Sequence, residues 1–139
     1  MRYPNSTVIV YDKGTFIQVA LRLREDFGKV KYFCPWSDVG RPTSDKWSIG
    51  QGIDGIERID SIYPHIDDAD LIIFTDVYDG AFQKWLRSKE YPVWGCGTAD
   101  SYELDRWKFR KYLDKLGMPI PETEFVTSVS YTHLTLPTI

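Results

Sequence analysis

The stretch Thr7–Cys34 reads TVIVYDKGTFIQVALRLREDFGKVKYFC and predicts the opening unit of a parallel α/β fold. Thr7–Tyr11 is an unbroken apolar and β-branched run, which is typical of a strand buried on both faces. A helix is predicted next from apolar residues at helical spacing: Phe16, Ala20, Leu23 and Phe27. We expect Gly28 to end this helix and Val30–Cys34 to form a second strand. Together they make a right-handed βαβ unit.

The same alternation continues along the chain and predicts a Rossmann-like, doubly wound parallel sheet in a single domain, residues 1–128. Asp70–Thr75 is expected to form a third buried strand, and Val93–Trp94 a fourth. Between them we predict a helix that Asp79 can cap, with an apolar face of Phe82, Trp85 and Leu86.

Three other segments have less regular patterns. Trp36–Gly55 is rich in Gly, Pro, Ser and Asp, and we expect a binding loop or an ordered excursion because plain connections are usually shorter. Ile56–Asp68 is compatible with a short helix or with a strand, interrupted at Pro64. Ile120–Thr127 is expected to be extended.

A second informative stretch, Tyr91–Pro121, reads YPVWGCGTADSYELDRWKFRKYLDKLGMPIP and predicts a strand, a Gly-Cys-Gly turn and an amphipathic helix. We expect Asp100 to cap the helix and Glu103 to complete a capping box. Gly117 supplies a left-handed terminal residue, and Pro119 prevents the helix from resuming. The helix has an apolar face of Phe109, Tyr112, Leu113 and Leu116, and a basic face that we expect to be solvated: Lys108, Arg110, Lys111 and Lys115.

The composition narrows the class of protein. The chain has 139 residues, a formal net charge of −3 and a pI near 5.3, which argues against a nucleic-acid-binding face. Cys34 and Cys96 fit neither a zinc spacing nor a redox pair, and we expect both to be small buried residues. The sequence contains no signal-peptide pattern and no apolar run near the ~20 residues of a membrane span, so we expect a cytoplasmic protein without a membrane partner.

Ligands of open parallel sheets bind beyond the carboxyl ends of the strands, so the turns after the strands hold the candidate substrate residues. Asp12, Lys13, Gly14 and Thr15 follow the first strand. This turn lacks a G-x-G-x-x-G motif, but its free amides and the charge of Lys13 suit an anionic substrate; an ordinary βα turn is the alternative. Asp76 follows the third strand, where its carboxylate could bind a sugar hydroxyl. A helix-capping or surface aspartate is the alternative interpretation.

We predict neither catalytic residues nor a metal site within this chain. His65 has no Cys or Ser nucleophile visibly paired with it, and a core or surface role is the simpler interpretation. The acidic residues Asp67, Asp68 and Asp70 precede a strand without the converging pattern that a cation needs. Arg106 lies near the start of the last helix, opposite the exposed basic run. A local ion pair with the adjacent Asp105 is the plain interpretation of this residue.

Three motifs in the second half of the chain resemble the N-terminal (pre-ATP-grasp) domain of ATP-grasp ligases. They are YPVWG at 91–95, ELDRWKF at 103–109, and KLGMPIP with ETEFV at 115–126. The resemblance is nearest to phosphoribosylamine–glycine ligase and its phage and bacterial relatives, and more distant to carbamoyl-phosphate synthase and biotin carboxylase. In these families a basic residue at the helix start reaches the nucleotide phosphates held by the next domain. Arg106 falls at that position, and a guanidinium can grip phosphate oxygens bidentately.

The resemblance implies ATP-dependent ligation of a carboxylate to an amine in purine biosynthesis, through an acyl phosphate and with Mg²⁺. ATP and Mg²⁺ would belong to the full-length protein, whose downstream ATP-grasp domain is missing here, so this fragment would bind neither alone and would be inactive. It would contribute one wall of a small-molecule substrate cleft, and a homodimer is a further possibility. The glycine-rich first turn of the glycine ligases is replaced by Asp12–Thr15, which leaves the substrate open.

Residues 129–139 (VSYTHLTLPTI) resemble the translation of a transposon-type sequencing adapter, so we expect a native reading frame truncated near Ser128. Three alternatives to a ligase fragment stay open. The first is a stand-alone α/β binding module for a nucleotide or sugar phosphate. The second is a nicotinamide-dependent oxidoreductase domain, disfavoured by the absent glycine fingerprint. The third is a non-catalytic interaction domain, suggested by five tryptophans.

Overall fold

The computed structural model describes residues 1–35 and 49–122. Trp36 and Trp47 of the expected binding loop, most of Ile120–Thr127 and the adapter-like tail lie outside the described residues. The chain divides into two compact units, Met1–Asp100 and Ser101–Ile139.

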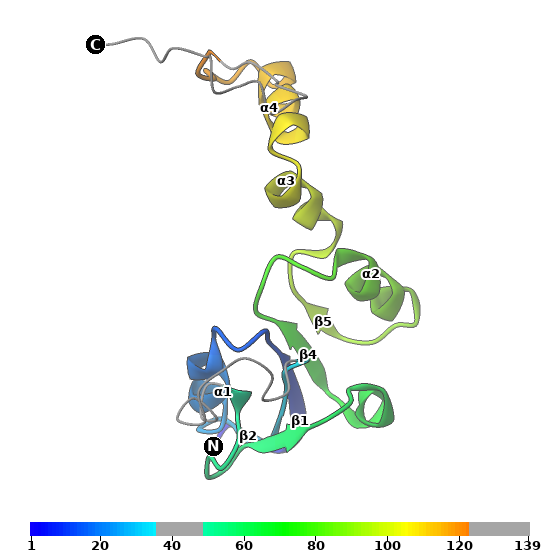
Figure 1. Ribbon diagram of the computed structural model, residues 1–139. Coiled ribbons are helices and arrows are strands. Elements are labelled where there is room, and N and C mark those ends of the chain that lie inside the picture. The colour runs from blue at the N-terminus through cyan, green and yellow to red at the C-terminus, as the bar shows by residue number, and fades with distance from the viewer. Residues whose placement is uncertain (36–48, 123–139) are drawn as a thin grey trace, which may run out of the picture. The chain divides into compact units, whose positions relative to one another are not determined.

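The first unit is built on a five-stranded parallel sheet with the strand order β3-β2-β1-β4-β5 (Figure 1). The strands are β1 (Tyr3–Tyr11), β2 (Phe27–Phe33), β3 (Glu57–Ile59), β4 (Leu71–Phe74) and β5 (Val93–Trp94). The chain starts in the centre, moves outward to β3, and returns to β4 on the other side of β1. The strand order therefore reverses between β1 and β4, and the predicted Rossmann-like parallel fold is confirmed.

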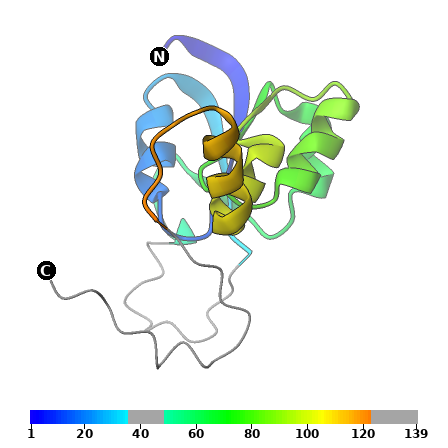
Figure 2. The same ribbon diagram turned by 90° about the horizontal axis from the view of Figure 1, so that it is seen from above.

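Helices cover both faces of this sheet, because the central strand β1 is apolar on both sides. Val8 and Val10 pack with the face that carries α1 (Ile17–Leu23), whereas Ile9 packs on the opposite face with Leu86 of α2 (Gly80–Ser88). Figure 2 shows α1 and α2 on opposite sides of the sheet. The 3₁₀ helix η2 (Tyr63–Asp68) adds Ile66 to the α2 face.

The structure of Ile56–Asp68 and the end of the first helix both differ from the sequence prediction. Ile56–Asp68 holds both a strand, β3, and a helix, η2, and Pro64 lies in the first turn of η2 rather than interrupting an element. The first helix, α1, ends at Leu23, so the prediction that it continues to Phe27 and ends at Gly28 is wrong. Phe27 begins β2, and its ring packs against Tyr3 with 5.1 Å between the centroids.

Gly28 is required by strand packing and not by helix termination. A Cβ at this position would lie 1.8 Å from the carbonyl oxygen of Pro4, in the first part of β1. The pairing of β1 with β2 also shifts register between Tyr3 and Thr7. A residue without a side chain therefore lets the irregular part of β1 approach β2.

The second unit contains two helices where the sequence predicted one. A short helix α3 (Asp100–Leu104) is separated from α4 (Arg106–Lys115) by Asp105, whose φ of −117° and ψ of 86° break the helix. Asp105 caps α4 by accepting a hydrogen bond from the backbone amide of Lys108 at 2.8 Å. The capping box predicted for Asp100 is wrong, because Asp100 accepts from the Gly80 amide at 2.9 Å instead.

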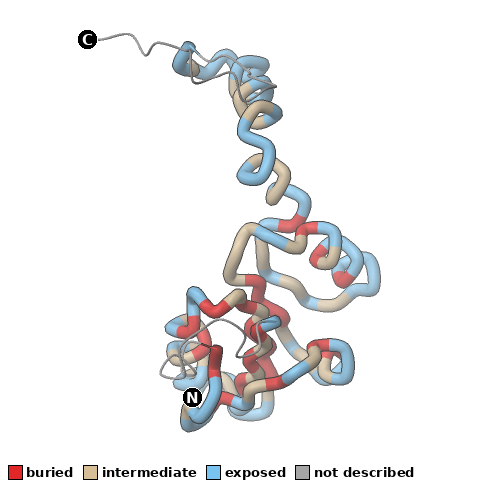
Figure 3. Tube along the Cα trace, viewed as in Figure 1, coloured by how far each residue is buried: buried red, intermediate tan, exposed pale blue. Residues whose placement is uncertain are grey.

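The predicted end of the last helix is confirmed: Gly117 adopts a φ of 68°. In the colouring of Figure 3, buried residues concentrate along the central strands, and none of residues 101–122 is buried. Within the described ranges, no helix combines the length and the apolar character that a membrane span requires.

We expect Gly28→Ala to lower the free energy of unfolding by about 2 kcal/mol, because the new Cβ must displace the Pro4 carbonyl, a backbone group with little freedom to move. Urea unfolding followed by circular dichroism measures the change. Lys29→Ala, at the next and exposed position of β2, is the control and should cost less than about 0.5 kcal/mol. An equal loss in both variants would contradict the steric explanation.

Candidate functional site

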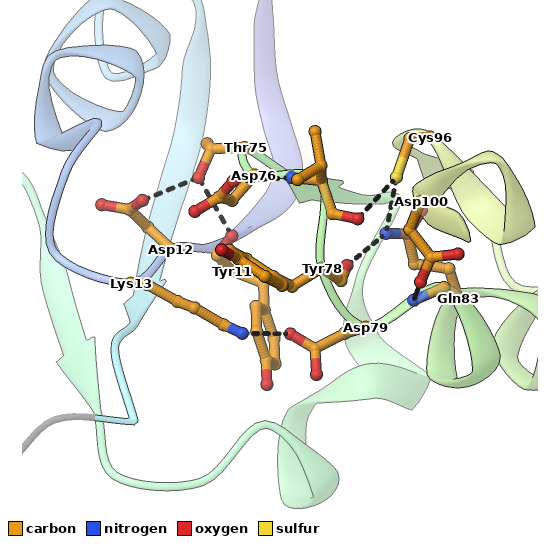
Figure 4. Close-up of polar contacts among 12 residues, drawn as sticks. Tyr11, Asp12, Lys13, Thr75, Asp76, Tyr78, Asp79, Gln83, Cys96 and Asp100 are labelled. Atoms are coloured by element: carbon orange, nitrogen blue, oxygen red, sulfur yellow. Dashed lines mark hydrogen bonds and ion pairs between the residues drawn. The ribbon is translucent and has the colours of Figure 1, made fainter. Parts of the chain in front are cut away.

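The candidate substrate site lies at the carboxyl edge of the sheet, where the turns after β1, β4 and β5 follow neighbouring strands. Figure 4 shows side chains from these turns and from the start of α2 gathered at this edge. The predicted residues Asp12–Thr15 and Asp76 all belong to it. Because the strand order reverses between β1 and β4, this is where an open parallel sheet normally binds its ligand.

Asp12 is fully buried and organises the first turn. Its Oδ2 accepts hydrogen bonds from the backbone amides of Thr15 at 3.1 Å and Phe16 at 2.9 Å, and from the hydroxyl of Tyr32. Its Oδ1 accepts from Thr75 Oγ1 at 2.8 Å (Figure 4). These two turn amides, which an anion would otherwise bind, are therefore occupied by a carboxylate of the chain itself.

The other residues of this turn differ in what they offer a ligand. Lys13 Nζ lies 3.2 Å from Asp79 Oδ2 and 4.2 Å from the centre of the Tyr78 ring. Its side chain is 25% exposed, so the ammonium stays within reach of solvent. Gly14 is buried with a φ of 80°, which a residue with a side chain rarely adopts. Thr15 is exposed.

Asp79 stands at the cap position of α2 but does not cap it. It adopts a left-handed conformation with a φ of 65°, and its side chain makes no hydrogen bond to the first turn. Its carboxylate pairs with Lys13 instead, so the predicted capping role is wrong. Asp76 is half-buried, and its Oδ1 accepts from the amide of Val77 at 2.7 Å.

Gln83 is a residue that the sequence analysis missed. It is fully buried on α2, its Oε1 accepts from the Gly97 amide at 2.8 Å, and its Nε2 donates to the Tyr78 carbonyl at 3.0 Å. It thereby joins the turns after β4 and β5. Cys96, in the turn after β5, is exposed, so the prediction that it is buried is wrong. Cys34 is buried, as predicted. The signal for Gln83 that the sequence offered was a polar residue on the apolar side of α2.

Tyr11 places a neutral hydroxyl close to this edge. Its ring stacks on Phe74 with 4.6 Å between centroids and also contacts Phe33. Burial, followed by the negative charge of Asp79, raises the pKa of Tyr11 to about 12. The hydroxyl therefore keeps its proton to a higher pH than an ordinary tyrosine and is able to donate a hydrogen bond.

An apolar groove of about 340 Å³ opens beside the same turns. Its lining is Phe16, Val19, Leu71, Ile73, Thr75 and Trp94. Trp94 is 65% exposed and Phe16 is 40% exposed, so two aromatic rings of this lining are accessible to a ligand. The volume lies within the range of about 300–1,000 Å³ that is usual for small-molecule sites.

Arg106 belongs to the second unit. It is the first residue of α4, and its Nη2 lies 2.8 Å from Glu103 Oε1, so its ion-pair partner is Glu103 and not Asp105. The guanidinium side chain is 72% exposed. It lines a pocket of about 420 Å³ formed within this unit by Arg106, Phe109, Arg110, Leu113, Pro119, Ile120 and Pro121.

Three of the remaining titratable candidates of the sequence have structural partners. His65 Nδ1 lies 2.8 Å from Lys31 Nζ, and Asp70 Oδ2 accepts from the Thr7 amide at 2.7 Å. Asp67 accepts from the hydroxyl of Tyr91. In the part of the chain that the structure describes, no group of three or more His, Cys, Asp and Glu residues is arranged to hold a metal ion.

We expect Asp12→Asn to lower the free energy of unfolding by about 3 kcal/mol, because the amide nitrogen would face a donor inside a buried site and leave it unsatisfied. Denaturant unfolding measures this loss. Asp76→Asn is the matched control, since the half-buried Asp76 accepts one amide of its neighbour. A loss in the control as large as in Asp12→Asn would argue against a special role for Asp12.

The raised pKa of Tyr11 predicts a stability loss at alkaline pH. The folded chain holds the Tyr11 proton up to about pH 12, whereas an unfolded tyrosine releases it near 10.0, so the unfolded state binds fewer protons between these values. Stability is therefore retained below pH ~10 and falls as the pH rises toward ~12. Urea unfolding of wild type and Tyr11→Phe across this range should give a shallower decline for the variant; identical slopes would contradict the shift.

Comparisons with known proteins place the fold. No family model matches the chain, and no curated protein matches it. Among solved structures, N5-carboxyaminoimidazole ribonucleotide synthetase from Thermotoga maritima is similar, with a TM-score of 0.58 and 17% sequence identity. The match covers 92% of this chain and 35% of the synthetase chain, so the present chain spans about a third of that protein's length. At this identity the likeness shows a shared fold.

Proposed function

We propose that this chain is the N-terminal, substrate-side domain of an ATP-dependent carboxylate–amine ligase of the ATP-grasp kind. The fold is that of a region of a ribonucleotide synthetase, and the motifs around Arg106 and Gly117–Pro119 match the order and spacing of such ligases. The observation that carries the proposal is the exposed guanidinium of Arg106 at the first position of α4.

The geometry around Arg106 suits a phosphate ligand. Its guanidinium is held by Glu103 at 2.8 Å, and both side chains are largely exposed, at 72% and 50%. An exposed pair of this kind is worth less than about 1 kcal/mol, so a more highly charged phosphate can take the place of the Glu103 carboxylate. In this proposal Arg106 neutralises phosphate charge during acyl-phosphate formation, where positioning and electrostatics dominate.

ATP would meet this chain at Arg106, and it supplies the phosphoryl group that activates the carboxylate. Magnesium, whose ligands are oxygen atoms, would be held by residues of a downstream domain, which is the partner that the proposal requires. Within the described ranges, no cluster of three or more His, Cys, Asp and Glu residues could hold it. On its own, this chain should not turn over.

The carboxyl edge would contribute the substrate wall. Asp12 and Gly14 are buried and shape the turn, whereas Lys13, Thr15 and Asp76 retain exposure and can contact a small molecule. An ammonium, a hydroxyl and a carboxylate together suit a polar, hydroxylated substrate that carries an anionic group. The resemblance to phosphoribosylamine–glycine ligase makes phosphoribosylamine with glycine the first pair of substrates to test.

A stand-alone binding module is the second candidate. The observation that favours it is the groove beside Phe16 and Trp94, which is formed within the first unit and needs no other domain. Such a module would bind a nucleotide or a sugar phosphate with its ring in the groove. A nicotinamide-dependent oxidoreductase is less suitable, because Asp12 occupies turn amides that a dinucleotide pyrophosphate would use.

The deciding experiment is to recover the uninterrupted gene and to measure ATP-dependent release of ADP or phosphate with candidate acids and amines. We expect the reading frame to continue past Ser128 into an ATP-grasp domain. Arg106→Ala should lower kcat/KM at least tenfold, about 1.4 kcal/mol of transition-state stabilisation, because a bidentate phosphate contact is lost. Lys115→Ala, which removes a charge at the other end of α4, is the control.

One outcome would argue against the ligase and another against the role of Arg106. A natural gene that stops near Ser128, with no nucleotide dependence of any activity, would favour the stand-alone module. Turnover that is unchanged in Arg106→Ala would remove the role assigned to this arginine.

A further inference from the structure

Arg110 lies in the same pocket as Arg106, although the sequence analysis assigned it to a solvated face. The two arginines are four residues apart on α4, which places them on one side of the helix and about one turn apart, roughly 6 Å along the axis. Both line the pocket of about 420 Å³ between α4 and Pro119–Pro121. Arg110 is half-buried, whereas the basic residues that it was grouped with, Lys108, Lys111 and Lys115, are exposed.

Arg110 forms no ion pair in the described ranges, although Asp114 and Glu122 line a neighbouring pocket together with it. The ion pairs recorded there join Lys13 to Asp79, Arg22 to Glu25 and Asp26, and Arg106 to Glu103. Two like charges one helical turn apart repel each other, and Glu103 offsets the charge of Arg106 alone. A half-buried guanidinium in this position would be stabilised by an anion in the pocket.

The rest of the pocket strengthens such an interaction. Five of its seven lining residues are apolar: Phe109, Leu113, Pro119, Ile120 and Pro121. Apolar walls lower the local dielectric constant, so a charge pair between them is screened less than one on an open surface. The start of α4 adds the positive end of its helix dipole next to Arg106.

We propose that Arg106 and Arg110 together form a two-arginine site for a polyphosphate chain, with Arg110 as the second phosphate-binding residue. Each guanidinium presents planar paired donors to phosphate oxygens, and their separation by one turn suits two phosphate groups of the same chain. The natural ligand would be the triphosphate of the nucleotide, an assignment that rests on the proposed function. The site itself is defined by the two arginines and the apolar lining.

The test uses the 139-residue chain and inorganic tripolyphosphate, titrated by isothermal calorimetry at low ionic strength. We expect Arg110→Ala to weaken binding about tenfold, a loss comparable to that in Arg106→Ala. Lys115→Ala, which removes the same charge from an exposed position of α4 outside the pocket, should weaken it less than about twofold. Arg110→Lys keeps the charge but not the paired donors and should restore binding in part.

Circular dichroism establishes that each variant is folded, and Arg110→Gln, which keeps most of the side-chain stem, replaces Arg110→Ala if the alanine variant is not. Equal weakening by Arg110→Ala and Lys115→Ala would overturn the site, since general electrostatic attraction would then explain the binding. Weakening by Arg106→Ala alone would overturn the role of Arg110 and leave the proposed function intact. Absence of tripolyphosphate binding by the wild-type chain would also overturn the site. The ligase proposal is tested separately, by ATP-dependent turnover of the uninterrupted protein.

Discussion

The buried carboxylate of Asp12 is the interaction on which the carboxyl edge of the sheet depends. It accepts hydrogen bonds from the turn after β1, from Tyr32 on β2 and from Thr75 after β4. Burying a carboxylate is costly unless its oxygens are hydrogen-bonded, and here both oxygens are. The same residue thus fixes the path of the first turn and joins three neighbouring strands at the point where the strand order reverses.

This arrangement has a consequence for ligand binding. In many α/β proteins the amides of the first turn hold a phosphate, but here the amides of Thr15 and Phe16 hold the chain's own carboxylate. A substrate at this edge would therefore meet side chains, among them Lys13 and Asp76, more than backbone amides. In the function proposed above, phosphate recognition falls instead to the guanidiniums of α4, because Arg106 and Arg110 line one pocket.

Two glycines allow close contacts between α2 and the turn after β5, at the β5 side of this edge. A Cβ on Gly80 would lie 2.3 Å from the Gly97 carbonyl oxygen, and a Cβ on Gly95 would lie 2.4 Å from Gln83 Oε1. Glycine at both positions lets α2 and the turn after β5 come together, and Gln83 and Asp100 then link them by hydrogen bonds. Two-residue β5 is thus supported by side-chain contacts as well as by its pairing with β4. A site built on such fixed turns can position a ligand without large rearrangement.

The amino-acid sequence by itself determined the parallel α/β class, because uninterrupted apolar runs such as Thr7–Tyr11 can be buried only in a sheet covered on both faces. It also placed β5 with its observed bounds, β4 to within one residue at each end, and the left-handed Gly117. These features depend on local pattern and backbone conformation.

Only the tertiary structure decided what the polar residues do. Asp12 and Thr75 are 63 residues apart in the chain, and Gln83 and Gly97 are 14 apart, so no local pattern announces their hydrogen bonds. Sequence spacing alone does not distinguish Arg110 from the exposed lysines of α4. Arg110 differs because it is half-buried and lines a pocket with Pro119–Pro121. Periodicity reports which side of an element is apolar, whereas the partner of a charged or polar group is set by segments that the fold brings to it from elsewhere in the chain.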